Sequence, residues 1–171
     1  MFEEGKNADK AVAKAQGFSS DFQQAGDAGR AVSAEEWQAV DKLLMSAAGG
    51  PVPAEGFKVL IDHTVCGGDS AWPSEKSFPM LDLLRLAVLG SNFSEVCREA
   101  GSSPGGVLQG LLSTGKGEGC HKNTRMLALR VMCNCFKHAA DSEVMAVLNG
   151  PETITWVLEC LATGDKNTKV S

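Results

Sequence analysis

The sequence lacks the features that would place it in several common classes. Its 171 residues contain no apolar run near the ~20 residues that span a bilayer. No stretch alternates polar residues with β-branched apolar ones, so strands are not predicted. The formal net charge of −5 argues against attraction of nucleic acid or an anionic membrane by the whole surface, although it is compatible with a local basic patch. We therefore expect neither nucleic acid nor a membrane as a partner.

Residue patterns for catalysis or metal binding are also scarce. Cys120 and His121 are adjacent in the sequence, an arrangement that rarely gives a thiol and a base the geometry of a reactive pair. Cys133 and Cys135 would lie about 200° apart around a helix, so they cannot share a metal ion. No Gly-Lys-Ser/Thr phosphate loop is present. The sequence therefore predicts no catalytic residue, no metal and no cofactor.

The cysteines and the first residues bear on the cellular compartment. The cysteines lie mostly in apolar helical patterns and follow no recognised disulfide or zinc spacing, which favours reduced core thiols. The first residues are acidic and polar, unlike a secretory signal. We expect a cytoplasmic location, with the nucleus as the alternative. The six cysteines are Cys66, Cys97, Cys120, Cys133, Cys135 and Cys160.

Regular helix starts and stops are present from Ser33 onward. Ser33 and Glu36 form a capping box, and Pro53, Pro79 and Pro104 suit the first turns of later helices. Residues 1–32 have few large apolar side chains and are expected to be a largely extended or disordered extension, with at most a short helix over 8–16. The predicted helices cover residues 33–48, 53–66, 78–89, 92–100, 104–115, 123–139 (the longest), 142–149 and 152–162.

Three pairs of weakly similar short segments indicate an internal repeat. Residues 107–115 resemble residues 156–164 at an offset of 49, and Lys-Asn-Thr occurs at both 122–124 and 166–168. Leu84-Arg85 matches Leu129-Arg130 at an offset of 45. Together they give a period of roughly 45 residues, in the range of HEAT and armadillo repeats.

The repeat defines the predicted architecture. We expect an all-α, armadillo-like solenoid of about three repeats, each built of two shorter helices and a long one, over residues 33–171. Residues 166–171 resemble the opening of a further long helix. The repeat domain is therefore expected to be truncated at its C-terminus.

Two segments resemble the PUL domain family, which is named for the phospholipase A2-activating protein and its fungal relatives. The first is Phe78-Pro-Met-Leu-Asp-Leu-Leu-Arg-Leu86, and the second is Leu127-Ala-Leu-Arg-Val-Met-Cys-Asn-Cys-Phe136. Lys166-Asn167 and, more weakly, residues 22–25 fall where the family has similar elements. The resemblance covers roughly residues 20–171 and is most specific in the second segment.

This resemblance implies a protein-interaction module. PUL domains are expected to bind the C-terminal tail of the hexameric AAA+ unfoldase known as valosin-containing protein, in ubiquitin-dependent degradation or ubiquitin homeostasis. The chain is then a monomeric adaptor and not an enzyme. Two alternatives stay open: a structural spacer without a peptide ligand, and a substrate-recruiting domain of a larger thioredoxin-like or deubiquitinase-like enzyme.

The helix over residues 123–139 has two faces with different predicted roles. An apolar stripe at helical spacing is suited to the core. It consists of Leu129, Met132, Cys133 and Phe136. The opposite side carries Met126, Arg130, Asn134 and Lys137, and asparagine and basic side chains of this kind can bind the backbone and the acidic groups of an extended peptide.

Arg85 is the leading candidate for contact with a partner. If Arg85 and Arg130 occupy equivalent positions of neighbouring repeats, packed helices would place them about 10 Å apart. A simpler alternative is that Arg85 pairs with Asp82 at i, i+3, or that these charges are only solvated. The predicted partner-binding residues are Arg85, Arg130, Asn134, Lys137, Lys122 and Asn123.

Overall fold

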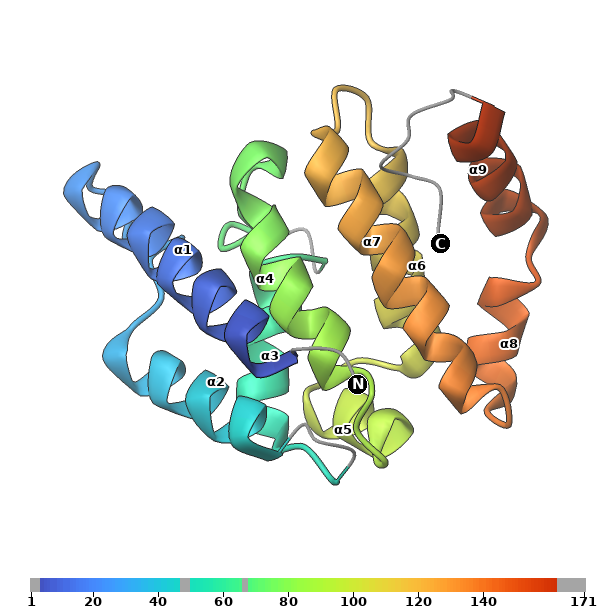
Figure 1. Ribbon diagram of the computed structural model, residues 1–171, viewed down its shortest axis with the longest axis horizontal. Helices are drawn as coiled ribbons and strands as arrows, with labels where there is room; N and C mark the ends of the chain where they lie inside the picture. The colour runs from blue at the N-terminus through green and yellow to red at the C-terminus, as the bar shows by residue number, and fades with distance from the viewer. Residues whose placement is uncertain (1–3, 47–49, 66–67, 163–171) are drawn as a thin grey trace.

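The computed structural model describes residues 4–46, 50–65 and 68–162, and within these ranges it is built of helices without strands (Figure 1). The predicted all-α solenoid is thereby confirmed, whereas the number of repeats stays a prediction. The predicted stop at Gly49 and the helix opening at Lys166 lie outside the described residues. The helices are α1 (Glu4–Gln24), α2 (Ala34–Ser46), α3 (Ala54–Asp62), α4 (Ser74–Ala87), α5 (Phe93–Glu99), α6 (Pro104–Lys116), α7 (Lys122–Cys135), the 3-10 turn η1 (Phe136–His138), α8 (Ser142–Leu148) and α9 (Pro151–Ala162).

Three long helices form one layer of the molecule. α1 packs against α4, and α4 packs against α7, so that the three run side by side across the face turned to the viewer in Figure 1. A second layer lies behind them, where α3 packs on α4 and α6 packs on α7. The core between the layers contains large buried side chains such as Phe57, Leu84, Phe93 and Leu108.

Capping residues fix several helix starts as the sequence predicts. Ser33 and Glu36 exchange hydrogen bonds, since the Ser33 N–H donates to Glu36 Oε2 at 2.7 Å and the Glu36 N–H donates to Ser33 Oγ at 3.2 Å. Asp141 caps α8 by accepting the N–H of Glu143 at 2.9 Å. Ser94 on α5 also donates to Asp141, and this bond is the main cause of the lowered pKa of the Asp141 carboxyl.

Boundaries of three helices differ from the prediction. α3 ends at Asp62, several residues before the predicted stop at Gly67-Gly68. α4 begins at Ser74, before the predicted Phe78, and therefore contains Pro79 in its second turn, where the missing N–H removes one helical hydrogen bond. α7 ends at Cys135 and continues as the 3-10 turn η1. Among the described residues the longest helix is consequently α1, not α7.

The prediction of an extended or disordered N-terminal extension is wrong for residues 4–24, which form α1. α1 contributes Ala11, Ala15 and Phe22 to the core, and small alanines allow α4 to approach closely. Ser19 Oγ accepts the N–H of Val32 at 2.8 Å, which ties the segment after α1 back to the helix. Tertiary packing thus supplies the stability that the local sequence lacks.

The environment of Trp72 is also determined by packing with α1 and not by its local sequence. Its position beside Pro73 in a loop favours an exposed side chain, but the indole is only 5% exposed. Phe18 and Phe22 of α1 lie against it at ring-centroid distances of 6.5 and 5.4 Å, and its Nε1–H donates to the Arg30 carbonyl at 2.8 Å. The aromatic cluster therefore joins the N-terminal helix to the rest of the domain.

Candidate functional site

Arg85 lies in the last turn of α4, on the face formed by α1, α4 and α7. Its Nε–H donates to Asp82 Oδ1 at 2.8 Å, and the two side chains are 23% and 25% exposed. The i, i+3 pair that the sequence left as an alternative is therefore present in the structure. Arg85 is still partly exposed, and its two terminal amino groups have no partner among the described residues. The guanidinium can therefore still receive a carboxylate.

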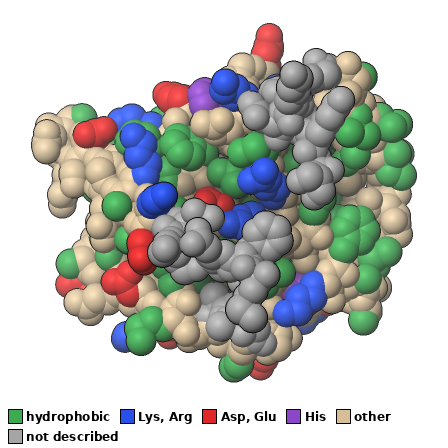
Figure 2. Space-filling model, viewed as in Figure 1, with side chains coloured by type: hydrophobic (Ala, Val, Ile, Leu, Met, Phe, Trp, Pro, Cys, Tyr) green, Lys and Arg blue, Asp and Glu red, His purple; other side chains and the backbone are tan. Residues whose placement is uncertain are grey.

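Three further candidate residues lie on α7. Arg130 is exposed and has no hydrogen-bond or ion-pair partner among the described residues. Lys122 is exposed at the start of α7, and the half-buried Asn123 follows it. Figure 2 shows several Lys and Arg side chains on this face of the molecule. Since α4 and α7 pack together, Arg85 and Arg130 belong to neighbouring helices of one surface.

A hollow of about 320 Å³ between α1 and α4 adds basic residues that the sequence interpretation missed. Lys10 and Lys14 line it from α1, Phe78, Pro79 and Asp82 line it from α4, and Leu127 lines it from α7. The ammonium of Lys14 also lies 4.6 Å from the centre of the Phe18 ring. The sequence alone does not assign these lysines to the site, because nothing in residues 1–32 indicates that they pack on α4.

Asn134 and Lys137 have a structural use that the sequence interpretation did not foresee. Asn134 Nδ2 donates to the Arg85 carbonyl at 2.8 Å, and Lys137 Nζ donates to the Leu89 carbonyl. The ring Nε2 of His138 lies 2.6 Å from the Val88 carbonyl. The last carbonyl groups of a helix have no partner within it, and α7 with η1 supplies partners for those of α4. Asn134 and Lys137 thus hold α4 against α7.

The start of α7 is fastened to the start of α4 in a similar way. The His121 N–H donates to Ser74 Oγ, and the buried Thr124 hydroxyl donates to the Ser74 carbonyl and lies 3.2 Å from Ser77 Oγ. These bonded residues are 47 to 50 positions apart in the sequence, as are Arg85 and Asn134 at 49. Hydrogen bonds at both ends therefore fix the position of α7 relative to α4.

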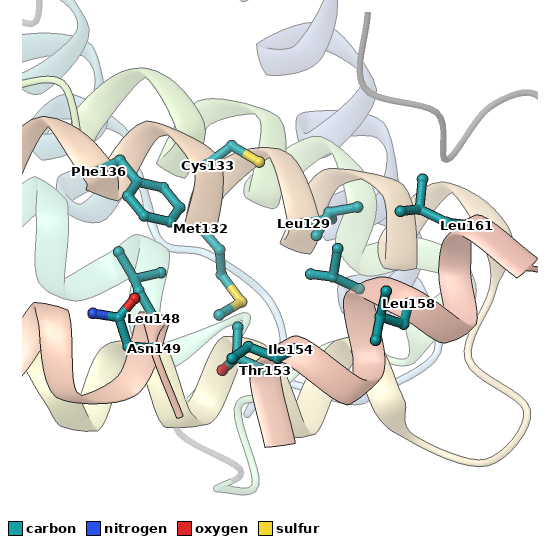
Figure 3. A pocket seen from close by; sticks show the side chains of 11 residues that line it. Leu129, Met132, Cys133, Phe136, Leu148, Asn149, Thr153, Ile154, Leu158 and Leu161 are labelled. Carbon is teal, nitrogen blue, oxygen red and sulfur yellow. The ribbon is translucent and has the colours of Figure 1, made fainter. Parts of the chain in front are cut away.

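The apolar stripe of α7 is only partly core. Leu129 and Met132 are buried as predicted, but Cys133 is half-buried and the Phe136 side chain is 52% exposed. The more deeply buried side of α7 instead carries Thr124, Leu127, Ala128, Val131 and Cys135. The stripe lines a second groove of about 450 Å³, the α7–α9 groove. Figure 3 shows its α9 wall, which carries Ile154, Leu158 and Leu161.

Cysteine and histidine chemistry in the described part of the chain points to structural roles. Burial raises the pKa of the Cys97 thiol to about 12 and also raises the pKa of Cys133 and Cys135, so these thiols are poor nucleophiles at neutral pH. The His121 ring accepts the N–H of Asn123 at 3.3 Å as the cap of α7 and stacks on Phe78. Each of these groups already serves packing or capping.

The described residues hold no trio of potential metal ligands, and none of their helices combines the length and apolar character needed to cross a bilayer. The fold places the chain in the class of helical solenoid domains, with several basic side chains on the face formed by α1, α4 and α7. Comparison with protein families narrows this class. The model of the PUL domain family matches residues 1–171, the whole chain, and the chain belongs to this family, whose members are protein-interaction domains. No solved structure matches the chain.

Proposed function

We propose that this chain is an adaptor domain whose α1–α4–α7 face binds the acidic C-terminal tail of a hexameric AAA+ unfoldase of the valosin-containing type. Such an adaptor would act in ubiquitin-dependent degradation or ubiquitin homeostasis, in the cytoplasm or the nucleus. The placement of Arg85 and Arg130 on the packed helices α4 and α7 is the observation that carries the proposal. The resemblance to PUL domains supports the identity of the partner.

The proposed binding residues have distinct tasks. Arg85 and Arg130 pair with carboxylates of the tail, and Lys122 and Asn123 contact it at the start of α7. Lys10 and Lys14 extend the basic surface onto α1. Asn134 and Lys137 contribute mainly by holding α4 against α7, since their donors reach α4 carbonyls. The domain performs no catalysis and needs no cofactor or metal in this role.

A peptide titration tests the proposal. The acidic tail peptide of the unfoldase is expected to bind the chain more tightly than a scrambled peptide of the same composition, with affinity that falls as salt rises. Replacing Arg85 or Arg130 with Gln should weaken binding about tenfold, because each change removes a charge-assisted contact. Lys42→Gln on α2 makes the same change in net charge at an exposed site and should leave binding nearly unchanged. Equal binding of the two peptides would refute the proposal.

A structural spacer is the second candidate, and the pairing of Arg85 with Asp82 is the observation that favours it. A spacer holds neighbouring domains at a fixed separation and has no peptide ligand of its own. Under this alternative the Arg85→Gln variant would change stability slightly and would alter no peptide affinity. The titration therefore discriminates between the two functions.

A further inference from the structure

Asp82 is a negative charge placed beside the basic side chains of Lys10, Lys14 and Arg85. Its Oδ1 accepts the Nε–H of Arg85, and the same carboxylate lines the hollow whose α1 wall carries Lys10 and Lys14. No other carboxylate lines that hollow among the described residues. A negative charge at this position reduces the positive potential that an acidic ligand would meet at α4.

The geometry of the pair determines how Asp82 acts on a ligand. Because the hydrogen bond uses Arg85 Nε, the two terminal amino groups of the guanidinium stay available, and a ligand carboxylate can bind them in a fork. Asp82 then stays in place when the ligand binds. Its repulsion of the ligand therefore persists in the complex and is not relieved by displacement.

We propose that Asp82 limits the affinity of this face for acidic peptides, so that the domain holds its partner weakly and releases it readily. This inference rests on the proposed function and concerns the same site. Asp82 also orients Arg85 through the hydrogen bond, and an amide would do so without the charge. The charge of Asp82, and not its hydrogen bond to Arg85, therefore weakens the binding of an acidic peptide.

The Asp82→Asn variant separates the charge from the orientation. The amide keeps an oxygen that can accept the Arg85 Nε–H, while the negative charge is removed. The unfoldase tail peptide is expected to bind this variant about threefold more tightly than the wild-type chain at low salt. The gain should shrink in 0.5 M salt because both charges are partly exposed.

Two matched variants test whether the effect is local. Asp41→Asn on α2 makes the same change in net charge at an exposed position, and it should change the affinity by less than about 1.5-fold. In an Arg85→Gln background, Asp82→Asn should give a smaller gain than in the wild-type background, since the two side chains act together. Asp82→Ser provides a second neutral variant if the amide variant does not fold, as judged by circular dichroism.

The outcomes separate this inference from the proposed function. If the wild-type chain binds the tail peptide and the neutral variants bind it equally or more weakly, Asp82 does not limit affinity and only this inference fails. If neither the wild-type chain nor the neutral variants bind the peptide better than a scrambled one, both proposals fail. Binding by Asp82→Asn alone would support the inference in its strongest form.

Discussion

The two sides of α7 differ in how completely the fold uses them. On the side facing α4, polar groups at both ends of α7 and in η1 bond to α4, from Thr124 at one end to Lys137 at the other. On the side facing α9, apolar side chains line an open groove, and Phe136 is more than half exposed. The side that faces α4 is thus fixed to its neighbour by hydrogen bonds, whereas the side that faces α9 is left partly exposed. Hydrophobicity alone does not identify the packed face of a helix that contacts several neighbours.

Among substitutions around α7 and its groove, the largest effect is expected at Gly115, through which α6 holds the α9 wall of the groove. A Cβ on Gly115 would lie 2.3 Å from Cζ2 of the buried Trp156, and the rigid indole could not move aside without displacing α9. Gly115→Val should lower the free energy of unfolding by about 2 kcal/mol, measured by urea titration with tryptophan fluorescence.

Gly17→Ala is the matched control for this measurement. A Cβ on Gly17 meets nothing within 4 Å, and the residue lies inside α1. This change should raise the free energy of unfolding by up to about 1 kcal/mol, because alanine favours the helix. An unchanged urea midpoint for Gly115→Val would show that α9 is not held by this contact.

An intermediate effect is expected on the polar side of α7. Asn134→Ala leaves the Arg85 carbonyl without its donor and should cost about 1 kcal/mol of stability. The control is Asn123→Ala on the same helix, whose side chain has no partner among the described residues. That variant should stay within about 0.5 kcal/mol of the wild-type chain. Equal losses in the two asparagine variants would mean that the bond to α4 contributes nothing.

The smallest effect is expected in the α7–α9 groove. Phe136→Ser should change the free energy of unfolding by less than about 0.5 kcal/mol, because the ring is already 52% exposed. It should also reduce the fluorescence of a dye that binds exposed apolar surface. Phe57→Ser is the contrast, since Phe57 is fully buried and its loss should cost at least about 3 kcal/mol. A large loss for Phe136→Ser would place that residue in the core after all.

Local signals predict much of the fold. The Ser33–Glu36 capping box and Pro104 at the start of α6 are short-range features, and the structure has both helices where these residues indicate. Helix periodicity does not reveal α1, because its buried apolar residues are few and two of the three are alanines. Its stability depends on the cluster around Trp72 in another part of the chain. The spacing of apolar residues within one segment does not predict contacts with residues far away in the sequence.

The candidate site shows the same division. The pair of Arg85 with Asp82 spans three residues and could be anticipated as an alternative from the sequence. The bonds of Asn134 and Lys137 to α4 could not, because they require the last turn of a helix nearly fifty residues away to lie beside them. Helical spacing indicates which residues share one side of a helix. Whether that side is buried, bonded or exposed depends on the elements that pack against it.

The spacing of the cross-helix hydrogen bonds also determines how the molecule opens. Ser74 with His121, Ser94 with Asp141 and Arg85 with Asn134 are 47 to 49 residues apart, so each bond joins a segment to the next one along the solenoid. Each segment is then stabilised mainly by its neighbours along the solenoid. The terminal helices can therefore unfold first while the central helices stay folded. Amide hydrogens of α4 and α7, which have neighbours on both sides, should exchange with solvent more slowly than those of α9.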